Sequence, residues 1–176
     1  MMKHQGFTLF ELLITLVILA IILGIGLPSF SAQLQKTRVQ TAVDLLINAI
    51  QTARSVAVAK NKRTLLIARD KEWHQGWYLF VDENQNGLQD IDEPTLLLAA
   101  PLKKVKIQGN SSVKTYISFV GTGEGRLIGK SPNSGAFMAG TLTICPEYKG
   151  TGIKLVLSRG GRLRYTPITE EECLQS

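Results

Sequence analysis

The sequence predicts an α+β fold in which one long N-terminal helix is followed by antiparallel β-sheet. Residues 31–60 contain no Gly or Pro and place an apolar side chain every three or four residues, the pattern of an amphipathic helix. Residues 63–176 then alternate short strand-like runs with clusters of Gly, Pro, Asn and Asp, which is typical of antiparallel sheets. A chain of 176 residues, 44% of them hydrophobic, is large enough for one ordinary core.

The helix begins with an apolar stretch. Residues 7–27 contain a single charged residue, Glu11, and twenty-one such residues are enough to span a bilayer. No small-residue cleavage site of the secretory type follows them, so we expect this helix to stay attached to the chain. The flanking basic residues Lys3, Lys36 and Arg38 are too few to set the orientation by the positive-inside rule.

The segment Gly6-Phe7-Thr8-Leu9-Phe10-Glu11 resembles the processing site of type IV pilins and of the pseudopilins of type II secretion. The resemblance implies that residues 1–6 are a leader, that a prepilin peptidase cuts between Gly6 and Phe7, and that the new amino group of Phe7 is methylated. Phe10 stands where the family more often has Leu or Ile, which keeps the apolar character.

Glu11 and Pro28 are the two residues of this helix expected to act in filament assembly. A carboxylate inside an apolar span is costly and is usually kept because it meets a partner. The resemblance supplies one for Glu11, the terminal amine of a neighbouring subunit's Phe7; the alternative is a carboxylate that reaches the headgroups. Pro28 removes a backbone hydrogen bond, so we expect a kink between Gly24 and Pro28, with a plain helix end as the alternative.

The expected organisation is a leader (1–6), a transmembrane half-helix (7–30), an amphipathic half-helix (31–62) and a β-rich head (63–176). Basic side chains off the apolar stripe are expected to face solvent; these are Lys36, Arg38, Arg54, Lys60 and Lys62. The predicted strands cover residues 63–68, 76–81, 95–99, 104–108, 114–120, 125–128, 141–145, 153–158 and 162–166.

Within the pilins, the head is most similar to the FimT, FimU and GspH branch of minor pilins and pseudopilins. The similarity rests on residues 76–82, GWYLFVD, and on residues 155–162, LVLSRGGR. It implies a single-pass protein of the bacterial inner membrane with its head in the periplasm. It also implies incorporation into a pilus at the cell surface, with other major and minor pilins as partners.

Cys145 and Cys173 are the only cysteines in the chain. Because a pilin head lies outside the cytoplasm, where disulfides persist, we expect these two to be bonded, with free buried thiols as the alternative. The bond would fasten the C-terminal tail to the strand that ends at Cys145. No Cys-x-x-Cys pair or His cluster favours zinc or redox chemistry.

Residues 82–93, DENQNGLQDIDE, match the calcium-loop pattern D-x-[DN]-x-[DN]-G-x5-E. The oxygen donors in that pattern are Asp82, Asn84, Asn86, Asp90 and Glu93. The flanking segments are strands rather than the helices of an EF-hand, and Asx turns explain the same residues as a hairpin connection. We therefore expect a plain acidic loop and no cofactor, with calcium binding as the alternative.

The most basic part of the chain, residues 101–166, has eleven Lys or Arg and two Asp or Glu, a net charge of +9. Such an excess favours an anionic partner such as nucleic acid. Gly160-Gly161 predicts a hairpin turn, and strand alternation places Arg162 and Arg164 on one face, about 6.6 Å apart. Two guanidinium groups so spaced suit successive phosphates, and Arg159 at the turn extends the row.

Residues 161–164, GRLR, resemble the GRxR element of FimT-type minor pilins, a group associated with DNA uptake in natural transformation. The resemblance implies binding of extracellular DNA that does not depend on base sequence. A second basic cluster comprises Lys103, Lys104, Lys106 and Lys114. Whether the two clusters share a surface is left open by the sequence, as is the alternative of a solvated basic face or one that meets an acidic pilin.

The predicted function is that of a minor type IV pilin that contributes to assembly and captures DNA. The alternative is a subunit without DNA affinity, either a FimU-like priming pilin or a GspH-like pseudopilin of type II secretion. We do not expect an enzyme, because His4 and His74 are the only histidines and no nucleophile and base occur at a recognisable spacing.

Overall fold

The computed structural model describes residues 8–110, 112–129 and 135–175, with side-chain exposure left out for residues 25–29. The cleavage site Gly6-Phe7 lies outside the described residues. The chain forms two compact units, Met1–Gln35 and Lys36–Ser176, and helix α1 (Leu9–Lys60) contributes to both. One long helix followed by antiparallel strands confirms the predicted α+β fold.

In the first unit, Thr8 caps the start of α1. Its Oγ1 accepts the backbone N–H of Glu11 at 3.2 Å, which satisfies one of the free amides of the first turn. The side chains of residues 9–24 are exposed and only Glu11 among them is charged, so this helical surface is apolar all round and suits lipid. The helix runs through Pro28 rather than ending there, and the expected kink stays a prediction.

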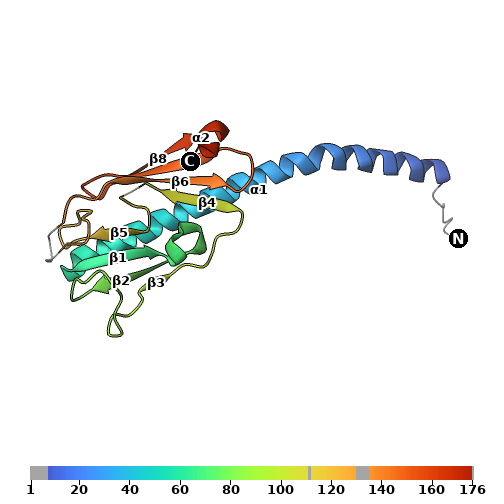
Figure 1. The fold of residues 1–176 in the computed structure, drawn as a ribbon. Helices are drawn as coiled ribbons and strands as arrows, with labels where there is room; N and C mark the ends of the chain where they lie inside the picture. The colour runs from blue at the N-terminus through green and yellow to red at the C-terminus, as the bar shows by residue number, and fades with distance from the viewer. Residues whose placement is uncertain (1–7, 111, 130–134, 176) are drawn as a thin grey trace. The chain divides into compact units, whose positions relative to one another are not determined.

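In the second unit, one stripe of α1 packs against both sheets and forms the centre of the core (Figure 1). Length and composition alone would let Phe30–Lys60 cross a membrane, but residues such as Leu46 and Ala53 are buried in the head. The buried stripe follows the predicted spacing and consists of Val39, Ala42, Val43, Leu46, Ala49, Ile50, Ala53 and Ala57.

Two four-stranded antiparallel sheets follow the helix. The first has the order β3-β2-β1-β5 and comprises β1 (Arg63–Ala68), β2 (Trp77–Asp82), β3 (Leu97–Leu98) and β5 (Tyr116–Phe119). The second has the order β4-β6-β7-β8 and comprises β4 (Val105–Gly109), β6 (Gly140–Pro146), β7 (Gly152–Leu157) and β8 (Leu163–Ile168). Two 3-10 turns, η1 (Arg69–Lys71) and η2 (Trp73–Gln75), connect β1 to β2.

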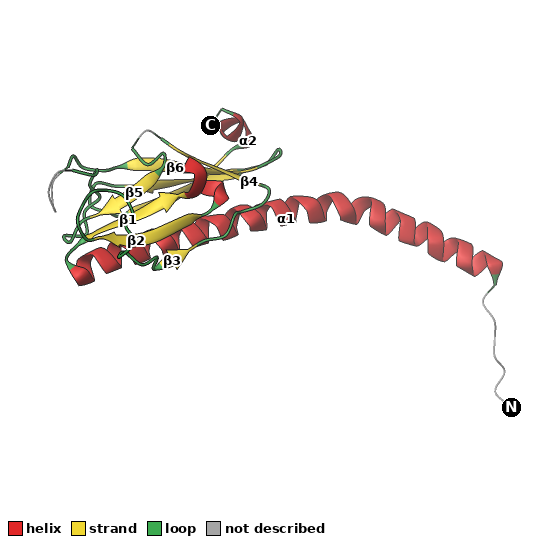
Figure 2. Cartoon of the chain, turned by 60° about the horizontal axis from the view of Figure 1, so that its bottom comes forward, coloured by secondary structure: helices red, strands yellow, loops and turns green. Residues whose placement is uncertain are grey.

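The register of the second sheet separates an apolar inner face from a polar outer face. Leu142 pairs with Leu155 and both are buried towards α1, whereas the neighbouring pair Thr143 and Lys154 points the other way. A short helix that the sequence did not predict, α2 (Glu170–Leu174), lies on the outer face, across the sheet from α1 (Figure 2). This outer face carries the candidate site.

One predicted strand is wrong. Residues 125–128 form only isolated bridges, Phe119 with Gly125 and Arg126 with Phe137. The reason is that successive amides in this segment bond to different parts of the chain: Gly125 donates to the carbonyl of Arg159, and Arg126 to that of Ser118. No continuous ladder can form from such contacts. The other eight predicted strands are present; β1 has the predicted ends and the other seven have shifted ends.

Candidate nucleic-acid interface

The turn between β7 and β8 is closed by hydrogen bonds on both sides. Ser158 donates its N–H to the carbonyl of Arg162 at 2.9 Å, and its Oγ accepts the N–H of Arg162 at 3.0 Å. Gly161 also donates to the carbonyl of Ser158 and has a φ of 73°, a left-handed conformation that favours glycine. The predicted Gly-Gly hairpin turn is therefore confirmed, and Arg159 and Arg162 flank a defined backbone.

The tip of this hairpin packs on helix α1. Arg54 donates its Nε–H to the carbonyl of Gly123 at 2.9 Å. A Cβ on Gly161 would come 2.6 Å from that same carbonyl oxygen and 3.0 Å from Arg54 Nε. Arg54 was expected to face solvent; it is instead partly buried, because its guanidinium fills the gap between the helix and the turn. No sequence pattern pointed to this contact.

Arg159, Arg162 and Arg164 all have exposed side chains. None of the three guanidinium groups forms a hydrogen bond or ion pair with another of the residues that the structure describes. Arg164 pairs with Val156 across the ladder and therefore lies on the outer face. These cationic donors are free to meet an external anion.

Tyr165 lies beside Arg164 on the edge strand, with 64% of its surface exposed. A shallow hollow of about 460 Å³ runs along this edge and is lined by Val156, Leu163, Arg164, Tyr165 and Thr166. Tyr165 pairs with Leu155, which faces α1, whereas Arg164 pairs with Val156 on the outer face, so the ring and the guanidinium point to opposite sides of the edge strand.

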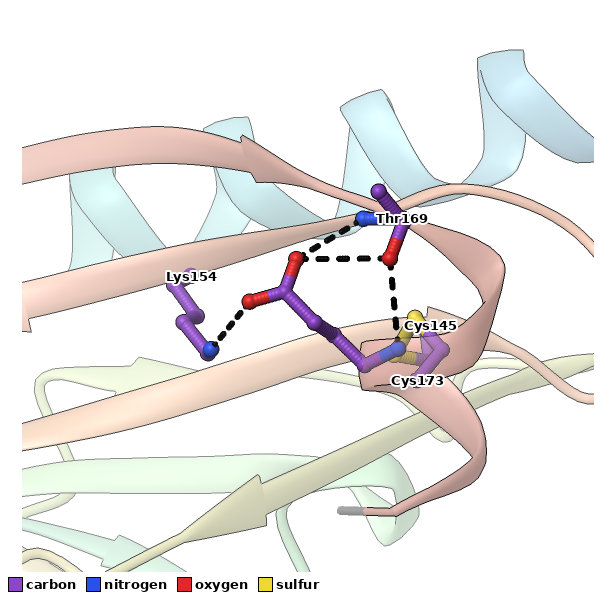
Figure 3. Close-up of polar contacts among 5 residues, drawn as sticks. Cys145, Lys154, Thr169 and Cys173 are labelled. Atoms are coloured by element: carbon purple, nitrogen blue, oxygen red, sulfur yellow. Dashed lines mark hydrogen bonds and ion pairs between the residues drawn. A yellow bond between two sulfur atoms is a disulfide. The ribbon is translucent and has the colours of Figure 1, made fainter.

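An acidic group lies near the ends of β7 and β8 that are opposite the turn (Figure 3). Lys154 Nζ lies 2.9 Å from a carboxylate oxygen of Glu172, and the other oxygen accepts the N–H of Thr169 at 3.0 Å. Thr169 Oγ1 accepts the N–H of Glu172 in return, so the two residues form a capping box at the start of α2. The hydrogen bond from Lys154, followed by that from the Thr169 backbone, lowers the pKa of Glu172.

The expected disulfide is confirmed, and it holds α2 against the outer face of the second sheet. Cys145 and Cys173 are bonded, with their Cα atoms 5.8 Å apart (Figure 3). Gly152 lies next to this bond, since a Cβ there would overlap the Sγ of Cys173. The acidic tail is therefore fastened over β6 and β7.

The lysine cluster lies elsewhere on the head. Lys104, Lys106 and Lys114 line a groove of about 660 Å³, and Lys71 from η1 joins them; Lys103 does not line it. Lys71 was missed because only the packing of η2 against β4 brings it there. We call this hollow the lysine groove. It is also lined by Glu72, His74 and Glu147.

The two basic clusters form separate surfaces. Lys106 is on β4 and Arg164 on β8, which are the two edges of one sheet and stand about 14 Å apart at about 4.8 Å per strand. The acidic helix α2 covers the sheet between them at the end that carries Lys106. The hairpin arginines and the groove lysines therefore cannot act as one continuous row.

The acidic loop connects the antiparallel strands β2 and β3. The prediction that it is a hairpin connection is therefore confirmed. Asp82 is fully buried, and its Oδ2 accepts the N–H of Gly87 at 3.1 Å. Burial raises the pKa of the Asp82 carboxyl; the Gly87 N–H opposes the shift and the carboxylate of Glu93 adds to it. Glu93, also buried, accepts the backbone N–H groups of Glu83 and Asp90.

Within the described residues, no three His, Cys, Asp or Glu side chains converge closely enough to hold a metal by themselves. The remaining oxygen donors of the calcium pattern are two carboxamides, Asn84 and Asn86, and one carboxylate, Asp90. Both Asn84 and Asn86 donate their Nδ2 hydrogens to Asp90 Oδ2, at 2.7 and 2.8 Å. Asn84, Asn86, Asp90 and Glu93 are thus linked by hydrogen bonds, whereas Asp82 is bonded to the N–H of Gly87.

Comparison with solved structures finds two crystal forms of the type IV minor pilin FimU of Pseudomonas aeruginosa. The first is 22% identical, with a TM-score of 0.55, and the match covers 75% of this chain and 90% of FimU. The second is 24% identical, with a TM-score of 0.49, and the match covers 73% and 92%. At this identity the likeness shows the fold alone. No curated protein sequence was found to match.

Two sequence families match the chain directly. Residues 1–27 match the prokaryotic N-terminal methylation motif, which includes the predicted processing site. Residues 42–161 match the family described as type II transport protein GspH, and this segment is more than half of the chain. The chain is therefore a pilin-like protein that belongs to the GspH family.

Proposed function

We propose that this chain is a minor type IV pilin whose β7–β8 hairpin captures extracellular DNA without regard to base sequence. The observation that carries the proposal is the set of three exposed guanidinium groups, without partners among the described residues, on a hairpin that α1 and Gly123 hold in place. Arginine forks bind phosphate oxygens well, and phosphate contacts do not read sequence.

The N-terminal half supplies the anchor in this proposal. A prepilin peptidase cuts between Gly6 and Phe7, and the apolar helix holds the protein in the inner membrane with the head in the periplasm. Glu11 lies in the first helical turn, four residues after Phe7 in the sequence, and its carboxylate meets the amine of a neighbouring pilin. Assembly with other pilins then carries the head, with its hairpin, to the cell surface.

The test is DNA binding by the full chain in detergent micelles, measured by fluorescence anisotropy with a short duplex and a single strand of unrelated sequences. Three phosphate contacts predict that log K against log salt falls with a slope of about −3 for duplex DNA. Arg162→Gln together with Arg164→Gln should weaken binding about tenfold and reduce the slope by about 2.

The matched control changes two other cations, Lys104→Gln and Lys106→Gln, which lie in the lysine groove. Because that groove is separate from the hairpin, the control should lose less than about threefold in affinity. Failure of the folded wild-type chain to bind at low salt would remove the DNA role. It would favour the second candidate, a structural subunit of the type II transport or pilus machinery, which family membership alone supports.

A further inference from the structure

We propose that the loop formed by residues 82–93 is a binding site for one calcium ion. The ion would be held by side-chain oxygens of Asp82, Asn84, Asn86, Asp90 and Glu93, together with the backbone carbonyl of Leu88. The site lies at the β2–β3 connection and uses none of the hairpin arginines, so it does not depend on DNA binding.

Asp82 provides the structural observation behind this proposal. Its side chain has no exposed surface, and its Oδ1 has no hydrogen-bond partner among the described residues. The other oxygen, Oδ2, accepts the N–H of Gly87 from within the loop, so the carboxyl group faces the loop interior. A buried carboxylate oxygen without a partner is costly, and coordination of a cation removes that cost.

The charges of the site call for a divalent cation. Asp82, Asp90 and Glu93 bring three carboxylates, and two of these residues are buried. Arg63, opposite Asp82 in the β1–β2 register, brings one buried positive charge, and its Nη1 also donates to Ser118. Three negative charges and one positive charge leave two negative charges for an ion to neutralise.

The loop backbone already has the form that the ligand pattern requires. Asn84 Oδ1 accepts the N–H of Asn86 at 3.1 Å, and Asn86 Oδ1 accepts that of Leu88 at 2.7 Å, which turns the chain inward at each donor. Gly87 has a φ of 76°, and a Cβ there would come 2.9 Å from the side chain of Ile128. The left-handed φ therefore favours glycine at the sharp turn of this loop.

Binding requires one rearrangement, in an exposed part of the loop. The Nδ2 groups of Asn84 and Asn86 now donate to Asp90. On binding, the carboxylate of Asp90 gives up these two hydrogen bonds and coordinates the ion. The carboxamide oxygens of Asn84 and Asn86 then coordinate the ion as well. Calcium, which accepts six to eight oxygens in flexible geometry, suits such a loop better than magnesium, which demands a near-ideal octahedron.

The experiment measures calcium binding to the full chain in detergent by equilibrium dialysis with radioactive calcium, alongside thermal unfolding in calcium, magnesium or chelator. We expect one ion per chain with a Kd of about 10⁻⁴ to 10⁻³ M, the range of extracellular calcium modules. Calcium at about ten times Kd should raise Tm, whereas equal magnesium should not.

Three single variants test the assignment. Asp82→Asn keeps an oxygen for the Gly87 N–H but removes the charge, and Asp90→Asn removes the charge of an exposed side chain; each should weaken binding at least tenfold. The control, Asp92→Asn, removes the same charge from an exposed position of the same loop that is not a ligand, and it should bind within about twofold of the wild type. Absence of binding by the folded wild type, or equal weakening in all three variants, would overturn the site.

Discussion

Arg54 Nε and the carbonyl oxygen of Gly123 are joined by a 2.9 Å hydrogen bond across 69 residues of sequence. Gly161 lies against both groups, since a Cβ on it would overlap the carbonyl oxygen. The basic hairpin is therefore docked on the helix that also forms the core of the head, rather than projecting freely. A docked hairpin presents Arg162 and Arg164 in a fixed position, which reduces the entropy lost on binding.

Gly161→Ala should lower the free energy of unfolding by about 1–3 kcal/mol, because it combines a left-handed φ with an overlap against backbone. It should also weaken DNA binding, since the turn must move away from Arg54. Urea unfolding and anisotropy on the same protein measure the two effects. Gly160→Ala is the control: nothing lies within 4 Å of its Cβ, so it should change stability by less than about 0.5 kcal/mol. Equal effects of the two variants would contradict the docked turn.

Replacing Cys145 and Cys173 together by Ser should lower the free energy of unfolding by about 3–4 kcal/mol. The bond closes a loop across a sequence separation of 28, and opening such a loop frees the unfolded chain. The measurement is urea unfolding, with the wild type in reductant as a second form of the same change. A loss below about 1 kcal/mol would mean that the C-terminal tail is held mainly by other contacts.

Much of this architecture follows from local pattern. The apolar stripe of α1, the strands β1 and β2 and the Gly160-Gly161 turn all depend on neighbouring residues, so their prediction from sequence succeeded. Residues 125–128 had the composition of a strand but no single partner strand, and pairing is a property of the whole fold.

The parts of the site that escaped prediction depend on distant contacts. Arg54 reaches Gly123 only because the sheets wrap the helix, and Lys71 reaches the lysine groove only through the packing of η2 on β4. Helix α2 is different: its Thr169-x-x-Glu172 capping box was visible in the sequence. The capping box was not used to predict a helix, because a run of three acidic residues, Glu170 to Glu172, also suits a solvated tail.

Glu172→Gln should raise the affinity for DNA by about two- to fivefold at low salt. The substitution removes a negative charge beside the hairpin and frees Lys154 from its ion pair, while glutamine can keep the capping box. Anisotropy titrations at two salt concentrations measure the change, which should shrink as salt rises. Glu171→Gln, an exposed neighbour without an ion pair among the described residues, is the control. An unchanged affinity in Glu172→Gln would show that α2 does not oppose DNA binding.

The same carboxylate predicts a pH dependence of stability. Because the folded state lowers the pKa of Glu172 below its ordinary value of 4.5, the group stabilises the fold above that value. This contribution is lost as the pH falls through the lowered folded pKa. Between pH 6 and about pH 3, the wild type should therefore lose more stability than Glu172→Gln, which lacks the group. Parallel losses in urea unfolding at both pH values would argue against the ion pair with Lys154.

Trp73→Phe should destabilise the head more than Trp77→Phe, although both indoles are 1% exposed and lie in one core with ring centres 6.3 Å apart. Trp73 donates its Nε1–H to the buried carbonyl of Val113 at 3.0 Å, whereas Trp77 Nε1 has no partner among the described residues. Both changes remove similar volume. Only Trp73→Phe also removes a hydrogen bond from a buried acceptor, the carbonyl of Val113. It should therefore lower the free energy of unfolding by about 1–3 kcal/mol more than Trp77→Phe does. Urea unfolding of the two variants gives the difference, and an equal or reversed order would show that the Trp73 bond adds nothing to the stability of the core.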